Sequence, residues 1–157
     1  MNKYIKLIIS ICIPLLIGFL GSAFTTSSIS TWYPELNKPV FNPPSWIFGP
    51  VWTLLYIMIG ISIYLVWVSK EKNKKMKKKT FFIFGIQLFL NFIWSILFFG
   101  NQLIGLAFVD IILLGIAIIF NIYFCYKISK NSAYLLIPYL LWVSFASVLN
   151  FAIFILN

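Results

Sequence analysis

The sequence contains no histidine and no arginine, and only three of its 157 residues are acidic, Glu35, Glu71 and Asp110. Without histidine, the commonest ligand of zinc and haem iron is missing, and so is the base of Ser-His and Cys-His catalytic pairs. The two cysteines, Cys12 and Cys125, form no CxxC motif and are interpreted as small packing residues. These absences exclude conventional hydrolases and metalloenzymes, so we predict no metal site and no bound cofactor.

Hydrophobic residues, in contrast, make up 62% of the chain and charged residues only 10%. Five apolar blocks cover residues 7–24, 46–68, 81–99, 103–126 and 133–156. Each block is close to the length of about 20 residues that a helix needs to cross a bilayer, and none alternates as a barrel strand would. Because backbone amides in lipid must pair within their own segment, the sequence predicts an all-α, polytopic membrane protein. We expect one domain over residues 1–157, a bundle of five transmembrane helices.

The first block also has the outline of a secretory signal peptide, with a basic start, an apolar run and small residues near Ala23. Its apolar run is longer than the roughly 7–15 residues of a typical signal peptide. This length favours a retained helix, and a cleaved leader is the alternative.

All twelve basic residues are lysines, and their positions predict an orientation. With five spans, Lys38 lies on one side of the membrane and eleven lysines lie on the other: Lys3, Lys6, the seven between Lys70 and Lys79, Lys127 and Lys130. The positive-inside rule then predicts a cell-membrane protein with a cytoplasmic N-terminus and an external C-terminus. The same distribution accounts for the net charge of +9. We therefore expect the lysine-rich loop to lie near anionic lipid headgroups and not to bind nucleic acid.

Few polar residues lie inside the apolar blocks, which makes each a candidate for function. Asp110, in "LAFVDIILL", is the one ionisable residue there, and either a structural or a ligand-side role is compatible with its position. The third block carries a polar stripe at helical spacing, formed by Gln87, Asn91, Ser95 and Gln102 beside Trp94 and Phe98. Such a stripe serves either as interhelical hydrogen bonding or as a ligand site.

Two other blocks carry aromatic faces at helical spacing, Phe48–Trp52–Tyr56 in the second and Tyr139–Trp142–Ala146–Leu149 in the fifth. Aromatic stripes in membrane helices are often packing or interfacial belts. Trp52 and Trp142 lie well inside their blocks, however, and Ala146 leaves free volume beside Trp142. The pattern predicts an apolar cavity lined by aromatic side chains.

The segment from about residue 25 to residue 44 links the first two blocks and contains four prolines, Pro34, Pro39, Pro43 and Pro44. A connection of this length is usually functional or disordered. Prolines restrict their own φ and the preceding residue, which lowers the entropy cost of holding one shape. We therefore predict a stiff lid that presses Trp32, Tyr33 and Phe41 onto the outer mouth of the bundle.

The stretch "WYPELNKPVFNPPSWIFGPVWTLLY" resembles the signature of the tryptophan-rich sensory proteins, the TspO family, which includes the mitochondrial translocator protein or peripheral-type benzodiazepine receptor. The resemblance continues through "NFIWSILFFG", "LAFVDIILL" and "AYLLIPYLLWVSFASVLNF" and so covers nearly the whole chain. It implies a five-helix bundle, commonly a homodimer, whose first loop caps a pocket for porphyrins and for synthetic isoquinoline or benzodiazepine ligands.

The resemblance also implies which residues bind the ligand, and these are Tyr33, Pro43, Phe48, Trp52, Tyr56, Ser95, Phe98, Gln102, Trp142, Ala146 and Leu149. Asp110 joins them as a candidate from its position alone. In bacterial members, tryptophans that match Trp52 and Trp142 are associated with light- and oxygen-dependent degradation of protoporphyrin, which makes these two residues catalytic candidates.

Two departures from the family limit what can be transferred. The cholesterol-associated pattern of animal members has a tyrosine and a following basic residue, where "VLNFAIFILN" has Phe151 and Ile155, so high-affinity sterol binding is not expected. Ser95 replaces a larger amide of some relatives, so ligand preference is not carried over.

Three functions are compatible with these features. The first is a receptor or regulator that binds metal-free protoporphyrin, which fits the absence of histidine. The second is an enzyme in which photo-excited porphyrin is degraded between Trp52 and Trp142, and the porphyrin itself supplies the reactivity. The third, a transporter, is disfavoured by the lack of repeats and the single intramembrane carboxyl group.

Overall fold

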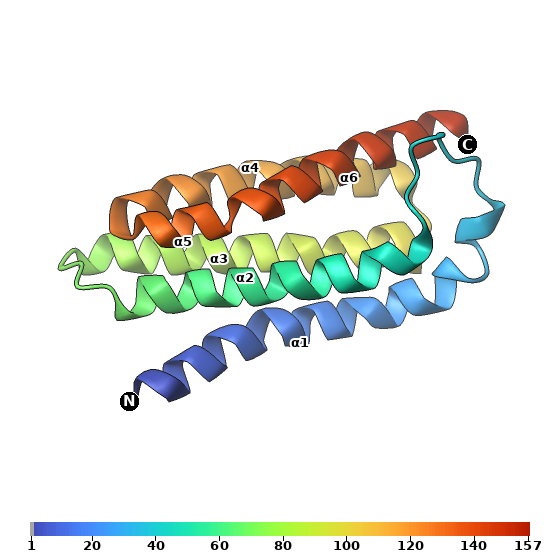
Figure 1. The fold of residues 1–157 in the computed structure, drawn as a ribbon. Coiled ribbons are helices and arrows are strands. Elements are labelled where there is room, and N and C mark those ends of the chain that lie inside the picture. The colour runs from blue at the N-terminus through green and yellow to red at the C-terminus, as the bar shows by residue number, and fades with distance from the viewer. Residues whose placement is uncertain (1) are drawn as a thin grey trace.

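The computed structural model describes residues 2–157 as a bundle of long helices lying side by side (Figure 1). The described residues contain no strand, and five helical segments are long and apolar enough to cross a membrane. The helices are α1 (Lys3–Ile29), α2 (Phe48–Val68), α3 (Lys74–Ser95), α4 (Ile104–Ile128), the short α5 (Lys130–Leu135) and α6 (Ile137–Leu156). The predicted all-α, polytopic membrane fold is confirmed.

The first helix is longer than its apolar block because polar residues continue it. The hydroxyl groups of Thr26 and Ser27 donate to carbonyl oxygens of their own helix, at 2.8 Å from Ser22 O and 3.1 Å from Phe24 O. Hydroxyl side chains paired in this way satisfy their own donors within the helix, so the helix continues through these polar residues. The connection to α2 therefore begins at Ser30 and not near residue 25 as predicted, and it contains two short helical turns, η1 (Tyr33–Glu35) and η2 (Ser45–Ile47).

The third and fifth spans also differ from their apolar blocks. Helix α3 begins at Lys74 and takes in most of the lysine run, because the side chain of Asn73 caps it by accepting from Met76 N at 3.0 Å. It continues into a wider turn, η3 (Ile96–Gly100). The fifth span is divided at Leu136, where α5 ends and α6 begins with Pro138 near its start. Proline lacks an amide hydrogen, so it interrupts the hydrogen bonds of a continuous helix.

The ends of the bundle differ in charge. The N-terminal end of α1, the α2–α3 connection and the α4–α5 junction lie together at one end, and the C-terminus lies with residues 30–47 at the other (Figure 1). The first of these ends carries the eleven clustered lysines, and Lys38 lies at the opposite end. This arrangement is the one that the positive-inside argument assumes, and the orientation itself stays a prediction.

Glycine allows α1 and α2 to approach closely in the lysine-rich half of the bundle. A Cβ atom added to Gly60 would lie 2.6 Å from Ile11 Cα and 2.8 Å from Ser10 O, both of which are backbone atoms. Small residues at such crossings let membrane helices gain van der Waals contact where lipid supplies no hydrophobic drive. Gly60 therefore determines how closely α1 lies against α2.

We expect Gly60→Ala to lower the free energy of unfolding by roughly 1–3 kcal/mol, because the methyl group must push the two backbones apart. Gly115→Ala is the matched control, since a Cβ there meets nothing within 4 Å. It should leave stability unchanged or raise it by up to about 1 kcal/mol through helix propensity. Denaturation of the purified protein in mixed micelles measures both, and equal stability of the two variants would contradict the close crossing.

Candidate functional site

A cavity of about 460 Å³ lies among α1, α2, α3 and α6, in the half of the bundle next to residues 30–47. This volume is within the range of about 300–1,000 Å³ typical of small-molecule sites. No lysine, aspartate or glutamate among the described residues lines it. The cavity is thus suited to a largely apolar ligand.

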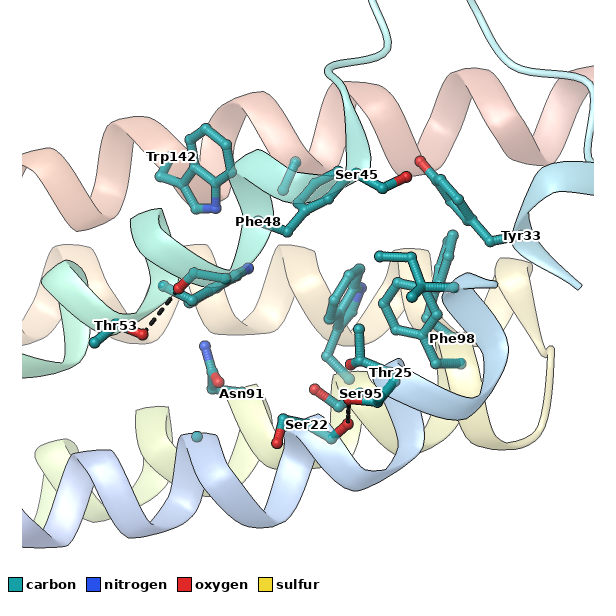
Figure 2. A pocket seen from close by; sticks show the side chains of 18 of the residues that line it. Ser22, Thr25, Tyr33, Ser45, Phe48, Thr53, Asn91, Ser95, Phe98 and Trp142 are labelled. Atoms are coloured by element: carbon teal, nitrogen blue, oxygen red, sulfur yellow. Dashed lines mark hydrogen bonds between the residues drawn. The ribbon is translucent and has the colours of Figure 1, made fainter. Parts of the chain in front are cut away.

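Flat aromatic rings form most of the inner wall. Trp52 stacks on Tyr56 with ring centroids 5.6 Å apart, and Trp94 stacks on Phe98 at 5.1 Å. Phe48 contacts Trp142 edge-to-face at 6.3 Å. Several rings from three different helices therefore face one space, as Figure 2 shows for Phe48, Phe98 and Trp142.

Asn91 ties two of the helices around this wall to α3. The hydroxyl of Tyr56 donates to Asn91 Oδ1, and Asn91 Nδ2 donates to the Tyr139 hydroxyl at 3.1 Å. All three side chains are buried, and Asn91 also lines the cavity. The polar stripe on α3 thus combines interhelical bonding with cavity lining at this residue, and it holds the ring against which Trp52 stacks.

A second amide orients Trp94. Trp94 Nε1 donates to Asn150 Oδ1 at 3.1 Å, and Asn150 Nδ2 donates to Ile104 O at 2.9 Å. Asn150 lines the cavity but was not predicted. Its position four residues after Ala146 and eight after Trp142 could have identified it, since all three share one helical face.

The indole nitrogen of Trp142 is different. Trp142 Nε1 is buried and has no hydrogen-bond partner within residues 2–157, although the side chain lines the cavity. Buried polar groups are normally paired, so this donor is an exception on a residue that lines the cavity.

Tyr33 closes the end of the cavity at the 30–47 connection. Its side chain is 3% exposed, and its ring packs against Phe48, Phe98 and Phe99 with centroids 6.4, 6.3 and 5.9 Å away. Its hydroxyl donates to Asn42 Oδ1 at 2.6 Å, and burial raises the pKa of Tyr33 to about 12, so the hydroxyl keeps its proton at neutral pH.

Lys38 organises the turn that carries Tyr33. Lys38 Nζ donates to three carbonyl oxygens, at 2.8 Å from Tyr33 O, 3.0 Å from Pro34 O and 2.8 Å from Leu36 O. One charged donor thus bonds three carbonyl groups of the same turn, of which that of Tyr33 also accepts from Leu36 N at 3.4 Å. The stiffness predicted from the prolines is reinforced by this lysine.

Nine of the twelve predicted ligand residues line the cavity, namely Tyr33, Phe48, Trp52, Tyr56, Ser95, Phe98, Trp142, Ala146 and Leu149. The structure does not bring Pro43, Gln102 and Asp110 to it. Pro43 lies in the connection before η2, and Gln102 is exposed between η3 and α4 with a φ of 59°. Asp110 is buried on α4, which contributes no residue to the cavity.

Helix α1 forms one whole side of the cavity, which the sequence did not indicate. It contributes seven residues: Leu15, Gly18, Phe19, Ser22, Thr25, Thr26 and Ile29. Gly18 is essential to this side, because a Cβ there would lie 2.2 Å from Tyr56 Cε2. The available signal was the run of small and hydroxyl residues at helical spacing, Gly18, Ser22 and Thr25.

Replacing Asn91 tests the amide at the inner wall. Asn91→Ala leaves the Tyr56 and Tyr139 hydroxyls without this partner, and we expect a loss of unfolding free energy of about 2–6 kcal/mol, at 1–3 kcal/mol for each of the two unpaired hydroxyls. Tyr56→Phe removes one hydroxyl and should cost less, about 1 kcal/mol. Chemical denaturation in micelles compares them, and a smaller loss for Asn91→Ala than for Tyr56→Phe would contradict the bridging role.

These features define a multi-pass membrane protein whose helices surround an aromatic-lined cavity. Residues 10–156 match the TspO/MBR family, and the chain belongs to that family. It is 55% identical to the tryptophan-rich protein TspO of Archaeoglobus fulgidus over 98% of this chain and 97% of the relative. It is 45% identical to the tryptophan-rich protein TspO of Chlorobaculum tepidum over 100% of this chain and 99% of the relative. It is also 36% identical to the human translocator protein over 86% of this chain and 80% of the relative.

Proposed function

We propose that this protein binds a flat tetrapyrrole such as protoporphyrin IX in the aromatic cavity and acts as a membrane receptor or regulator of porphyrin metabolism. The observation that carries the proposal is the cavity wall itself, in which Phe48, Trp52, Trp94, Phe98 and Trp142 face one apolar space. A porphyrin offers a large π surface, and stacked or edge-to-face aromatic contacts are favourable beyond the area that they bury.

The polar groups of the cavity agree with a metal-free porphyrin. Histidine is absent from the sequence, and the unpaired Trp142 Nε1 donor could meet an acceptor on the ligand. No cationic side chain within residues 2–157 lines the cavity, so porphyrin carboxylates would lie at its opening, where water or headgroups solvate them. Isoquinoline or benzodiazepine ligands fit the same chemistry, and a homodimer remains a proposal from the family resemblance.

Filling the cavity tests binding directly. Ala146 is 9% exposed and lines the cavity, so Ala146→Phe should reduce protoporphyrin affinity by at least about tenfold, which corresponds to about 1.4 kcal/mol. Val148→Phe is the matched control, because Val148 lies on the same helix with its side chain exposed and outside the cavity. Tryptophan quenching titrations measure both, and an unchanged affinity of Ala146→Phe would place the ligand elsewhere.

A finer proposal is that bound protoporphyrin is degraded in light and oxygen with the help of Trp52 and Trp142. The specific observation is that both indoles line the cavity, with Trp52 also packed 6.2 Å from the ring of Tyr139. Tryptophan is easily oxidised, and the excited porphyrin and dioxygen supply the reactivity. Binding and degradation should therefore separate when the indoles are replaced.

We expect Trp52→Phe and Trp142→Phe each to keep porphyrin affinity within about tenfold, because phenylalanine retains most of the stacking surface. Both should strongly slow the light-dependent loss of the Soret band under air. Trp46→Phe is the control, since Trp46 is 74% exposed and lies outside the cavity. Wild-type degradation rates in both variants and in the double variant would show that the indoles serve only as walls.

A further inference from the structure

The cavity is exposed on one side only. Among its lining residues, the exposed ones are Phe19, Ser22 and Thr26 on α1, Ser45 in η2, and Gly49 and Thr53 at the start of α2. The lining residues of α3 and α6 are all buried or half-buried. The opening of the cavity is therefore a gap between α1 and α2, which we call the α1–α2 window. Figure 2 shows Ser22 and Thr53 on the two sides of this space.

The end of the cavity at residues 30–47 is closed by packing. Trp32 packs edge-to-face on Phe98 at 5.8 Å, next to the buried ring of Tyr33. Ser28 Oγ donates to Phe99 O at 2.6 Å and fastens the end of α1 to η3. These contacts leave no exposed aromatic edge of the cavity at this end.

The connection is also bonded to the last residue of the chain. Asn37 N donates to Asn157 Oδ1 at 3.0 Å, and Asn157 Nδ2 donates back to Asn37 O at 3.0 Å. Asn37 Nδ2 donates to Leu156 O at 3.2 Å. This clamp holds the connection against α6, so opening it would break these three hydrogen bonds together.

The window faces lipid along most of its length. Phe19 is 73% exposed, and its apolar neighbours Leu16, Leu20 and Leu54 are exposed within the spans of α1 and α2. In a bilayer such side chains contact acyl chains and not water. The window ends where Gly18 packs against Tyr56. From there toward the lysine-rich end of the bundle, α1 and α2 are in direct contact.

The hydroxyl groups of Ser22, Thr26 and Thr53 can face lipid because each already donates a hydrogen bond to a backbone carbonyl oxygen. Ser22 Oγ donates to Phe19 O at 2.6 Å, Thr26 Oγ1 to Ser22 O at 2.8 Å and Thr53 Oγ1 to Gly49 O at 2.9 Å. These three hydroxyl groups therefore expose no unpaired donor to hydrocarbon, which would be costly. The oxygen atoms still offer lone pairs to a passing N–H or O–H group.

We infer that the α1–α2 window is a lateral portal through which flat, apolar amphiphiles dissolved in the bilayer reach the cavity. Residues 30–47 form a fixed wall at one end of the cavity, and ligands do not enter through this connection. The polar edge of such a ligand stays near Thr26 and Ser45, the rim residues closest to the ends of the two spans, while its rings enter between the aromatic side chains. The inference rests on the proposed porphyrin site and adds the route and the physical class of ligand.

Bulky residues at the rim test the portal. Thr53→Phe and Ser22→Phe narrow the window from opposite helices, and protoporphyrin transfer from liposomes to protein in nanodiscs is followed by stopped-flow tryptophan quenching. We expect association and dissociation both to slow by about tenfold or more, because a narrower portal slows passage in both directions, whereas lost contacts with the bound ligand would speed dissociation. Ser144→Phe is the matched control, since Ser144 is exposed, lies outside the cavity and donates to Leu140 O at 2.8 Å as Thr53 does to Gly49 O. It should leave both rates unchanged.

Variants that weaken the end wall at residues 30–47 provide the complementary experiment. Asn157→Ala and Lys38→Gln, tested separately, should leave both rates within about twofold of wild type if ligands pass through the window. Faster rates in these variants, with wild-type rates in Thr53→Phe and Ser22→Phe, would overturn the portal and assign access to the connection. Weaker binding of the rim variants through faster dissociation alone would also overturn it, because the rim would then be part of the binding site. If the wild-type protein binds no protoporphyrin, the proposed function is refuted. If the wild-type protein binds it and the rim variants keep wild-type affinity and rates, only the portal is refuted.

Discussion

Hydrogen bonds between buried amides and hydroxyls hold most helices of this bundle together where a bilayer offers no water to pair them. Gln87 Nε2 donates to Asn121 Oδ1 at 2.8 Å between α3 and α4, and Asn150 joins α6 to both α3 and α4. Ser62 and Ser132 pair at 2.7 Å between α2 and α5. Because each group would be costly to expose to lipid, these contacts determine which helices are neighbours and at what depth they meet.

Helix α1 is held mainly by packing contacts and not by hydrogen bonds to other helices, and it borders the cavity. Within residues 2–157, its one side-chain hydrogen bond to another element is from Ser28 to Phe99 O, near its end. It also makes close packing contacts along its length: a Cβ at Gly60 would meet the α1 backbone at Ser10 and Ile11, one at Gly18 would meet Tyr56, and one at Gly21 would lie 3.2 Å from Ser95 Oγ. The cavity lies beside the half of α1 from Leu15 to Ile29, with its window toward lipid between α1 and α2.

The site is a consequence of the same arrangement. Asn91 and Asn150 belong both to the interhelical network and to the cavity wall, so the residues that stabilise the fold also orient the rings of Tyr56 and Trp94. An aromatic site supported in this way is rigid on the α2, α3 and α6 sides. Adjustment to ligands of different outline then falls to α1, which has the fewest polar ties to the rest of the bundle.

The sequence by itself determined the five spans, the family and the faces that carry Trp52, Trp142 and Ala146. Hydropathy and helical periodicity are local properties, so they can be read without knowing how helices meet. Only the tertiary structure decided that α1 forms a wall of the cavity and that Asp110 and Gln102 lie away from it. Which side chains share a cavity depends on helix crossing and on the path of the connections, which no local pattern records. Gly18 illustrates the point: its role depends on the ring of Tyr56, thirty-eight residues further along the chain.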